Sequence, residues 1–302
     1  MSQKPYVPAP AADFVLPFDL PEVGLRGRLV RLDLTSSRAL SAHKLAEPAA
    51  RVAGETLALA AILGSSLKLD GRLTVQTKSD GPLDIVTVDY RGAGDGKPAG
   101  LRGYARLDAE RFGKLTAPVL FEKLAGEGAL AITIEPRNGD QAYQGVVELS
   151  DLGMGASAET YFSQSEQLPT VIRLAATPVY TPGETHPRWR AGGIMLQATP
   201  EGRRDNDDDW ERLTMFLETV EPFELVDTEL KGEDLLWRLF NEDEVRVLPF
   251  EKIEFRCDCD SSRIKDVLES YSEEDRRGLA DPDGIIRARC EFCGTVHEVK
   301  VT

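Results

Sequence analysis

All four cysteines of the chain lie near its end, in two close pairs. Cys257 and Cys259 form a Cys-x-Cys pair, and Cys290 and Cys293 form a Cys-x-x-Cys pair after an insert of thirty residues. Two close pairs around a short foldable insert are typical of a four-thiolate metal site. We expect zinc, because soft thiolates in a tetrahedral set suit it. The sequence therefore predicts one zinc ion held by these four residues.

The same four residues could respond to oxidants. Thiolates bound to zinc are already deprotonated, and two adjacent thiol pairs can each close into a disulfide. Oxidation would remove the ligands and release the metal, and a small unit whose folding depends on that metal would lose its structure too. Two interpretations follow from the spacing: a redox switch, and a zinc knob that is purely structural.

Length and composition limit the remaining possibilities. The chain has 302 residues, of which 41% are hydrophobic, enough for two domains with a sizeable core. No apolar run reaches the roughly 18 residues that span a bilayer, and the first residues do not resemble a secretory signal. Clustered cysteines fit a reducing compartment, so we expect a cytoplasmic protein that does not bind membranes.

The negative charge is concentrated in one segment. The net charge is −15, and residues 201–244 carry 16 acidic and 5 basic side chains, a net of −11. Nucleic-acid binding needs a basic surface, so the composition argues against nucleic acid as a partner. The commonest role of such an acidic run is a solvated face or a linker.

Residues 1–200 are predicted to form one α+β domain that is rich in antiparallel sheet. The Ala-rich stretch from Leu45 to Leu63 predicts a core helix with Pro48 in its first turn. Turn signals predict hairpins at Asp80-Gly81 and at Asn138-Gly139. Ser157 is expected to cap a helix over residues 158–167. The expected strands are 24–33, 71–78, 83–90, 101–107, 129–134, 143–149, 171–176 and 190–198.

Residues 201–244 are predicted to be an acidic helical linker. Asp205 to Asp209 should cap a helix from Trp210 to about Glu218, and a second helix should run from Gly232 to Asn241. Helices this short are marginal alone and need something to pack on.

Residues 245–302 are predicted to be the four-cysteine module. Helices should begin at Asp260 and Ser272, followed by a hairpin of residues 285–289 and 296–301. At about this size a metal is often required for stability.

Other arrangements of reactive residues are weaker. Ser41-Ala42-His43-Lys44 and Ser65-Ser66-Leu67-Lys68 match Ser-x-x-Lys at chance level, and no phosphate-binding loop is present. His43 and His186 are dispersed. His297 follows Cys293 closely, but four cysteines already complete a tetrahedron.

Beyond these patterns, the sequence resembles the redox-regulated 33-kDa heat-shock chaperone family of bacteria through most of its length. The cysteine pairs and the length of their insert match the family. The sequence departs from the family pattern at Asp258 and Asp260, which are more acidic than is usual there. The other matching stretches are Asp80-Gly81-Pro82-Leu83, Leu101 to Ala105, Tyr143 to Val147, Tyr161-Phe162, Ser165 to Thr170, Ala191 to Ile194, Leu196-Gln197 and Leu236 to Phe240.

The resemblance implies a non-enzymatic, ATP-independent holdase of the stress response. Reduced, zinc-bound protein would be inactive. Oxidants would form Cys257–Cys259 and Cys290–Cys293 disulfides and release zinc. The acidic segment would then unfold, and the active form, a homodimer, would bind non-native client proteins.

Two alternatives remain open. The first is a binding adaptor whose zinc knob is purely structural. The second is a thiol oxidoreductase that uses Cys290-x-x-Cys293, a motif that normally needs a strand-to-helix context.

Overall fold

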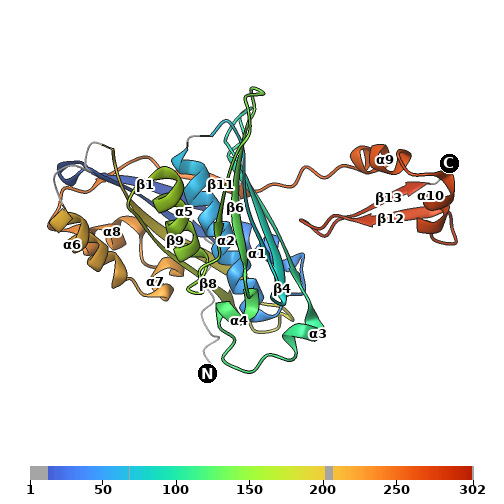
Figure 1. The fold of residues 1–302 in the computed structure, drawn as a ribbon, viewed down its shortest axis with the longest axis horizontal. Coiled ribbons are helices and arrows are strands. Elements are labelled where there is room, and N and C mark those ends of the chain that lie inside the picture. Colours follow the sequence, from blue (N-terminus) through green and yellow to red (C-terminus); the bar gives the residue numbers. More distant parts are fainter. Residues whose placement is uncertain (1–12, 68, 201–206, 301–302) are drawn as a thin grey trace, which may run out of the picture. The chain divides into compact units, whose positions relative to one another are not determined.

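The computed structural model describes residues 13–67, 69–200 and 207–300 (Figure 1). The chain divides into two compact units, Met1–Phe255 and Arg256–Thr302. The first unit is a large, mostly antiparallel sheet with helices packed on it, and the second is a small hairpin with two helices. The predicted α+β class is confirmed. Among the described residues, no helix combines the length and apolarity needed to cross a membrane.

One sheet organises the first unit. Its strands follow the order β7-β6-β3-β4-β5-β11-β1-β2-β9-β8, with β10 also paired to β1. Strand β11 runs parallel to β5, and the other described pairs are antiparallel. The strands are β1 (Phe14–Leu20), β2 (Leu25–Leu32), β3 (Gly71–Ser79), β4 (Leu83–Arg91), β5 (Ala99–Leu107), β6 (Gly128–Pro136), β7 (Tyr143–Glu148), β8 (Thr170–Val179), β9 (Arg188–Ala198), β10 (Arg246–Val247) and β11 (Glu251–Phe255).

Strands β1, β2 and β9 bury side chains on both faces. In β1, Val15 belongs to one apolar core, whereas Leu16 and Phe18 belong to a second. Successive side chains of a strand point to opposite faces, so this alternation separates the two cores by the thickness of the sheet. In β9 the neighbours Ile194 and Met195 divide in the same way.

The first core is built around helix α2 (Glu47–Ser66), which confirms the predicted Ala-rich helix (Figure 1). Residues Leu57 to Ile62 are completely buried, and Pro48 lies in the first turn as expected. The other described α-helices before residue 200 are α1 (Leu34–Ser41), α3 (Ala109–Phe112), α4 (Phe121–Ala125) and α5 (Met154–Tyr161).

The second core joins the acidic segment to the sheet. Helices α6 (Asp207–Glu218), α7 (Pro222–Val226) and α8 (Gly232–Phe240) bury their apolar side chains against β1, β2, β8 and β9. The rings of Phe18 and Phe240 stack with centroids 5.9 Å apart. Phe18 lies over Gly27 of β2, where a Cβ atom would fall 2.0 Å from its ring, so only glycine fits. The segment thus has the packing partner that its short helices need.

The second unit follows the predicted order of elements. Helix α9 (Ser261–Glu269) is capped by Asp260, and helix α10 (Glu273–Leu279) is capped by Ser272. Strands β12 (Ile285–Arg289) and β13 (Val296–Lys300) form the expected hairpin. Among the described residues, the buried core of this unit contains three apolar side chains, Leu268, Ile286 and Val299, with the partly buried Ile264 and Ala280 packed against it.

Several sequence predictions need correction. Ser157 does not cap a helix: α5 begins at Met154, and the Ser157 hydroxyl donates to the Gly153 carbonyl within the helix. The helix therefore starts earlier than expected, and it continues into a π-helical turn over Phe162–Glu166.

Strand β1 and helix α1 were not anticipated. Proline at position 17 obscures the alternation of β1, and α1 begins where the distant Asp13 carboxylate accepts a hydrogen bond from the Thr35 backbone N–H at 2.7 Å.

The boundary between the compact units falls after Phe255. Strands β10 and β11, which follow Val245, belong to the large sheet. The division into 1–200, 201–244 and 245–302 stays a prediction about functional parts. The proposed capping residues Asp205 and Asn206 lie outside the described residues.

Helix α2 carries an unusual carboxyl group. Burial raises the pKa of Glu55 from 4.5 to about 7, although Arg51 opposes the shift. The folded chain therefore retains a proton that the unfolded chain releases, and the stability of the first unit should fall as pH rises from about 4.5 to about 7. We expect Glu55→Gln to be more stable than the parent by about 2 kcal/mol at pH 8, and by much less at pH 5.

Urea unfolding at the two pH values, followed by tryptophan fluorescence, measures this difference. Glu47→Gln is the control, because Glu47 is an exposed group on the same helix that pairs with Arg51. An equal effect of Glu55→Gln at pH 5 and pH 8 would contradict the interpretation.

Candidate metal centre

The four cysteines come together in the second unit. Cys257 and Cys259 lie in the segment that precedes α9, and Cys290 and Cys293 lie in the turn between β12 and β13. All four sulfur atoms lie within 4.8 Å of one another. The structure thus brings together the four residues that the sequence singles out.

Backbone hydrogen bonds close the hairpin turn that carries Cys290 and Cys293. The backbone N–H of Cys290 donates to the Thr295 carbonyl, and that of Gly294 donates to the Cys290 carbonyl, each at 2.8 Å. Gly294 has φ = 72°, a left-handed conformation that glycine adopts without strain. Because the Cys-x-x-Cys pair closes a β-hairpin, it lacks the strand-to-helix context that an oxidoreductase motif needs.

The spacing of the sulfurs fits a tetrahedral metal. The Cys257 and Cys290 sulfurs are 3.7 Å apart, and the Cys259 and Cys293 sulfurs are 3.3 Å apart. A tetrahedron with metal–sulfur bonds of about 2.3 Å has edges of about 3.8 Å. Four thiolates at this spacing could hold one metal ion, and a closed set of four leaves no open position for substrate.

The local environment shifts the pKa values of two of the thiols in opposite directions. Burial raises the pKa of Cys259, and hydrogen bonds with Cys293 and Cys257 add to the shift. Burial also acts on Cys293, but hydrogen bonds with the side chain and backbone of Thr295 and with Cys259 and Cys290 together outweigh it and lower its pKa to about 6. The Thr295 hydroxyl oxygen is 3.2 Å from the Cys293 sulfur. A bound divalent cation would favour the thiolate at every sulfur.

The neighbouring aspartate has a structural role. Asp260 accepts hydrogen bonds from the backbone N–H and the hydroxyl of Ser262, at 3.1 and 2.7 Å, and so caps α9. The helix therefore starts immediately after the first cysteine pair. Its capped start helps to position Cys257 and Cys259 beside the hairpin turn.

The other candidate residues do not join this cluster. His297 lies on β13 opposite Ala288, and it is not a member of the described group of potential ligands. His43 stacks edge-on with Tyr104, and His186 lies in an exposed loop. The Ser41 hydroxyl donates to the Arg38 carbonyl, and Lys68 lies outside the described residues. Neither Ser-x-x-Lys match therefore gains support.

The acidic segment is held on the sheet by a buried arginine as well as by its apolar core. Arg31 of β2 donates to the Glu224 carbonyl at 3.0 Å and to the Leu230 carbonyl. Arg238 of α8 pairs with Glu224, and Arg212 of α6 pairs with Asp243 at 2.8 Å. The sequence does not point to Arg31, because an arginine within a strand pattern gives no sign of being buried.

Comparison with known proteins gives a consistent result. A family model described as Hsp33 protein matches residues 13–300. The 33 kDa chaperonin of Caulobacter vibrioides is 39% identical over 293 residues, covering 95% of this chain and 94% of the relative. That of Aeromonas salmonicida is 34% identical, covering 92% and 88%.

The fold also has a solved counterpart. The crystal structure of the 33 kDa chaperonin (heat shock protein 33 homologue) from Thermotoga maritima matches with a TM-score of 0.74 at 20% identity. The match covers 95% of this chain and 94% of that one, and at this identity it supports the fold alone.

The three-residue core of the second unit generates a prediction about metal removal. We expect a zinc chelator under reducing conditions to unfold residues 256–300, because little apolar burial remains to hold them. Amide hydrogen exchange followed by mass spectrometry should show lost protection in this unit and unchanged protection in α2.

The matched variants are Cys257→Ser and Ser261→Ala. The first removes a ligand and should reproduce the effect of the chelator, whereas the second changes a nearby exposed residue and should not. A chelated protein that keeps full protection in β12 and β13 would show that the metal does not stabilise this unit.

Proposed function

The chain belongs to the Hsp33 family, and from this premise we propose that it is a redox-regulated, ATP-independent chaperone that holds unfolding proteins. The family and the names of its relatives make it a heat-shock chaperone. The observation that carries the proposed regulation is the cluster of four sulfurs within 4.8 Å of one another in a unit with a very small core.

In the proposed resting state, Cys257, Cys259, Cys290 and Cys293 hold one zinc ion as thiolates. Zinc suits this set because it prefers tetrahedral sulfur ligands and has no redox chemistry of its own. The ion supplies the cross-link that joins the first cysteine pair to the hairpin.

Oxidation would act on the ligands. Each disulfide removes two electrons from a pair of thiolates, and one peroxide molecule accepts them and is reduced to water. We propose, from the family resemblance, that the pairs are Cys257–Cys259 and Cys290–Cys293. Disulfide sulfurs are poor ligands, so the site would no longer hold the ion, and the second unit would unfold.

The acidic segment is the element that would respond. Strand β11 ends at Phe255, two residues before Cys257, and helices α6–α8 precede it in the chain. Loss of these helices from the sheet would expose apolar side chains of β1, β2 and β9 that they now cover, including Leu16, Phe18 and Leu196. A large exposed apolar surface is what a holdase needs to bind non-native clients. We further propose that the oxidised form is a homodimer and that the protein acts in the cytoplasm.

Client aggregation tests the function directly. We expect the peroxide-treated chain to suppress light scattering from a thermally unfolding client, and the reduced, zinc-loaded chain to have little effect, without added ATP. Released zinc, measured with a colorimetric chelator, should reach one equivalent as four thiols disappear. Equal activity of the two forms would contradict redox regulation and would favour the alternative of a binding adaptor with a structural zinc knob.

Peptide mapping of the oxidised protein by mass spectrometry should find Cys257–Cys259 and Cys290–Cys293 disulfides. The sulfur pairs at 3.7 and 3.3 Å are Cys257 with Cys290 and Cys259 with Cys293. Disulfides across those pairs would overturn the proposed pairing, because they would preserve the cross-link that zinc provides.

The role of the acidic segment has a separate test. Phe240 is fully buried against Phe18, and Phe240→Ala should weaken the packing of α8 by about 3–5 kcal/mol. We expect this variant to suppress client aggregation even when it is reduced. Phe223→Ala is the matched control, because Phe223 is 65% exposed on α7. A reduced Phe240→Ala protein that is folded but inactive would argue against release of this segment as the activating step.

A further inference from the structure

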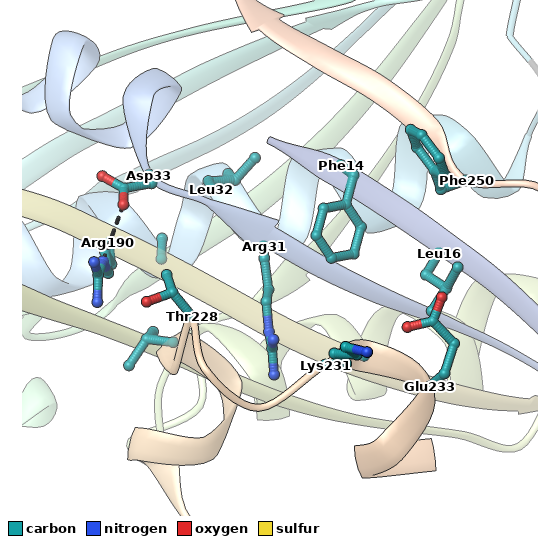
Figure 2. Close-up of a pocket in the computed structure, with 13 residues that line it drawn as sticks. Phe14, Leu16, Arg31, Leu32, Asp33, Arg190, Thr228, Lys231, Glu233 and Phe250 are labelled. Carbon is teal, nitrogen blue, oxygen red and sulfur yellow. Dashed lines mark hydrogen bonds and ion pairs between the residues drawn. The ribbon is translucent and has the colours of Figure 1, made fainter. Parts of the chain in front are cut away.

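A cavity of about 290 Å³ lies in the first unit, between the sheet and the acidic segment (Figure 2). Strands β1, β2 and β9 form one side of it, and the loop between α7 and α8 forms the other. Its volume is at the lower end of the range for small-molecule sites. The lining combines apolar side chains with a few charged ones, which is the usual composition of a site for a small ligand.

Arg190 is a buried cation in the lining of this cavity, and one of its donors lacks an acceptor among the described residues. The residue is only 8% exposed, and its Nε donates to the Asp33 carboxylate at 3.0 Å. Its Nη2 is buried and has no hydrogen-bond partner among the residues that the structure describes. A buried, charged donor without an acceptor is costly, and buried polar groups are nearly always satisfied.

Two further donors line the same cavity. Arg31 is 7% exposed, and its Nε has no hydrogen-bond partner within the described part of the chain, although its two Nη atoms hold the backbone of the acidic segment. The buried hydroxyl of Thr228 is likewise unsatisfied among the described residues. All three residues line the cavity, and Figure 2 draws Thr228 between Arg190 and Arg31.

The charges of the lining favour an anion. Arg31, Arg190 and Lys231 are cationic, and Asp33 and Glu233 are anionic. Asp33 is already paired with Arg190 and lies 3.6 Å from Arg188, so its charge is largely balanced. Lys231 and Glu233 are both exposed at the start of α8, and Glu233 and Asp227 act electrostatically on Arg31. The donors that remain without acceptors are therefore mostly cationic.

The rest of the cavity is apolar. Phe14 and Phe250 meet edge to face with ring centroids 6.4 Å apart, and Leu16 and Val226 also contribute to the lining. Figure 2 shows Phe14 between the arginine side chains and Phe250. Phe250 is 57% exposed, so an apolar group bound beside it would cover a ring that solvent now reaches.

We propose that this cavity binds a small amphipathic carboxylate, with the acid group on Arg190, Arg31 and Thr228 and the apolar body against Phe14 and Phe250. The carboxylate accepts hydrogen bonds from donors that otherwise lack acceptors, and charge assistance strengthens them. The ligand contacts both the sheet and the α7–α8 loop, so its binding stabilises the packed arrangement of the acidic segment.

The test uses octanoate and the reduced, zinc-loaded full chain, with binding measured by isothermal titration calorimetry. We expect one octanoate to bind per chain. Acetate has the charge without the tail, and 1-octanol has the tail without the charge, so each should bind at least about tenfold more weakly.

Two variants localise the site. Thr228→Val removes a donor at nearly constant volume, and Phe250→Ala removes half of the aromatic pair. Each should weaken octanoate binding by at least about fivefold. Phe223→Ala, an exposed phenylalanine of α7 outside the lining, should leave the affinity unchanged. Arg190→Lys keeps the charge but loses the planar fork, and it should also weaken binding if circular dichroism shows a native fold.

Hydrogen exchange gives an independent readout. Octanoate should slow exchange in residues 226–232 of the parent and not in Phe250→Ala. Absence of saturable binding, equal binding of octanoate and 1-octanol, or octanoate binding that Thr228→Val and Phe250→Ala leave intact would each overturn the proposal.

Discussion

The second unit depends on what holds its four sulfurs together. Its buried core has three apolar side chains, too few to offset the entropy of ordering some fifty residues. The two cysteine pairs come from the segment before the capped helix α9 and from a hairpin turn, and these elements otherwise meet in the same small core. A metal held by these four sulfurs would couple the stability of this unit to the state of its thiols. Such a metal would bind only while the thiolates survive, so in the proposed mechanism a chemical change at four sulfur atoms would become a change in folding.

The first unit is built differently, with a sheet whose strands β1, β2 and β9 are buried on both faces. Alternate side chains of β1, β2 and β9 enter two separate cores, one around α2 and the other beneath α6–α8. The core around α2 packs one long helix, most of whose side chains are buried, against the strands. The other core is made from short helices whose outer faces are acidic, and these helices rely on contacts such as the Phe18–Phe240 stack and the bonds from Arg31. The helices on the acidic face are short and depend on contacts with distant strands. They are therefore better suited to reversible release from the sheet than the long helix α2.

Buried arginines form the polar part of the face that α6–α8 cover. Arg31 donates two hydrogen bonds to backbone carbonyls of the acidic segment, and Arg190 donates one to the Asp33 carboxylate. Each keeps a buried donor without an acceptor among the described residues, beside an aromatic pair. This combination distinguishes the cavity from ordinary packing defects, which are apolar.

The sequence alone determined the four-cysteine cluster, the α+β class, the core helix and most strands, because each depends on local spacing: thiol pairs, turn residues and short-range periodicity. The caps at Asp260 and Ser272 were predictable for the same reason, whereas Ser157 carried a capping signal that an earlier helix start overrode. Tertiary structure decided what local patterns cannot encode. Strand β11 joins β5 and β1 from far along the chain, and Asp13 starts a helix twenty residues away. The acidic helices find their partner in β1, β2 and β9, and Arg31 and Arg190 become buried only when these distant segments meet.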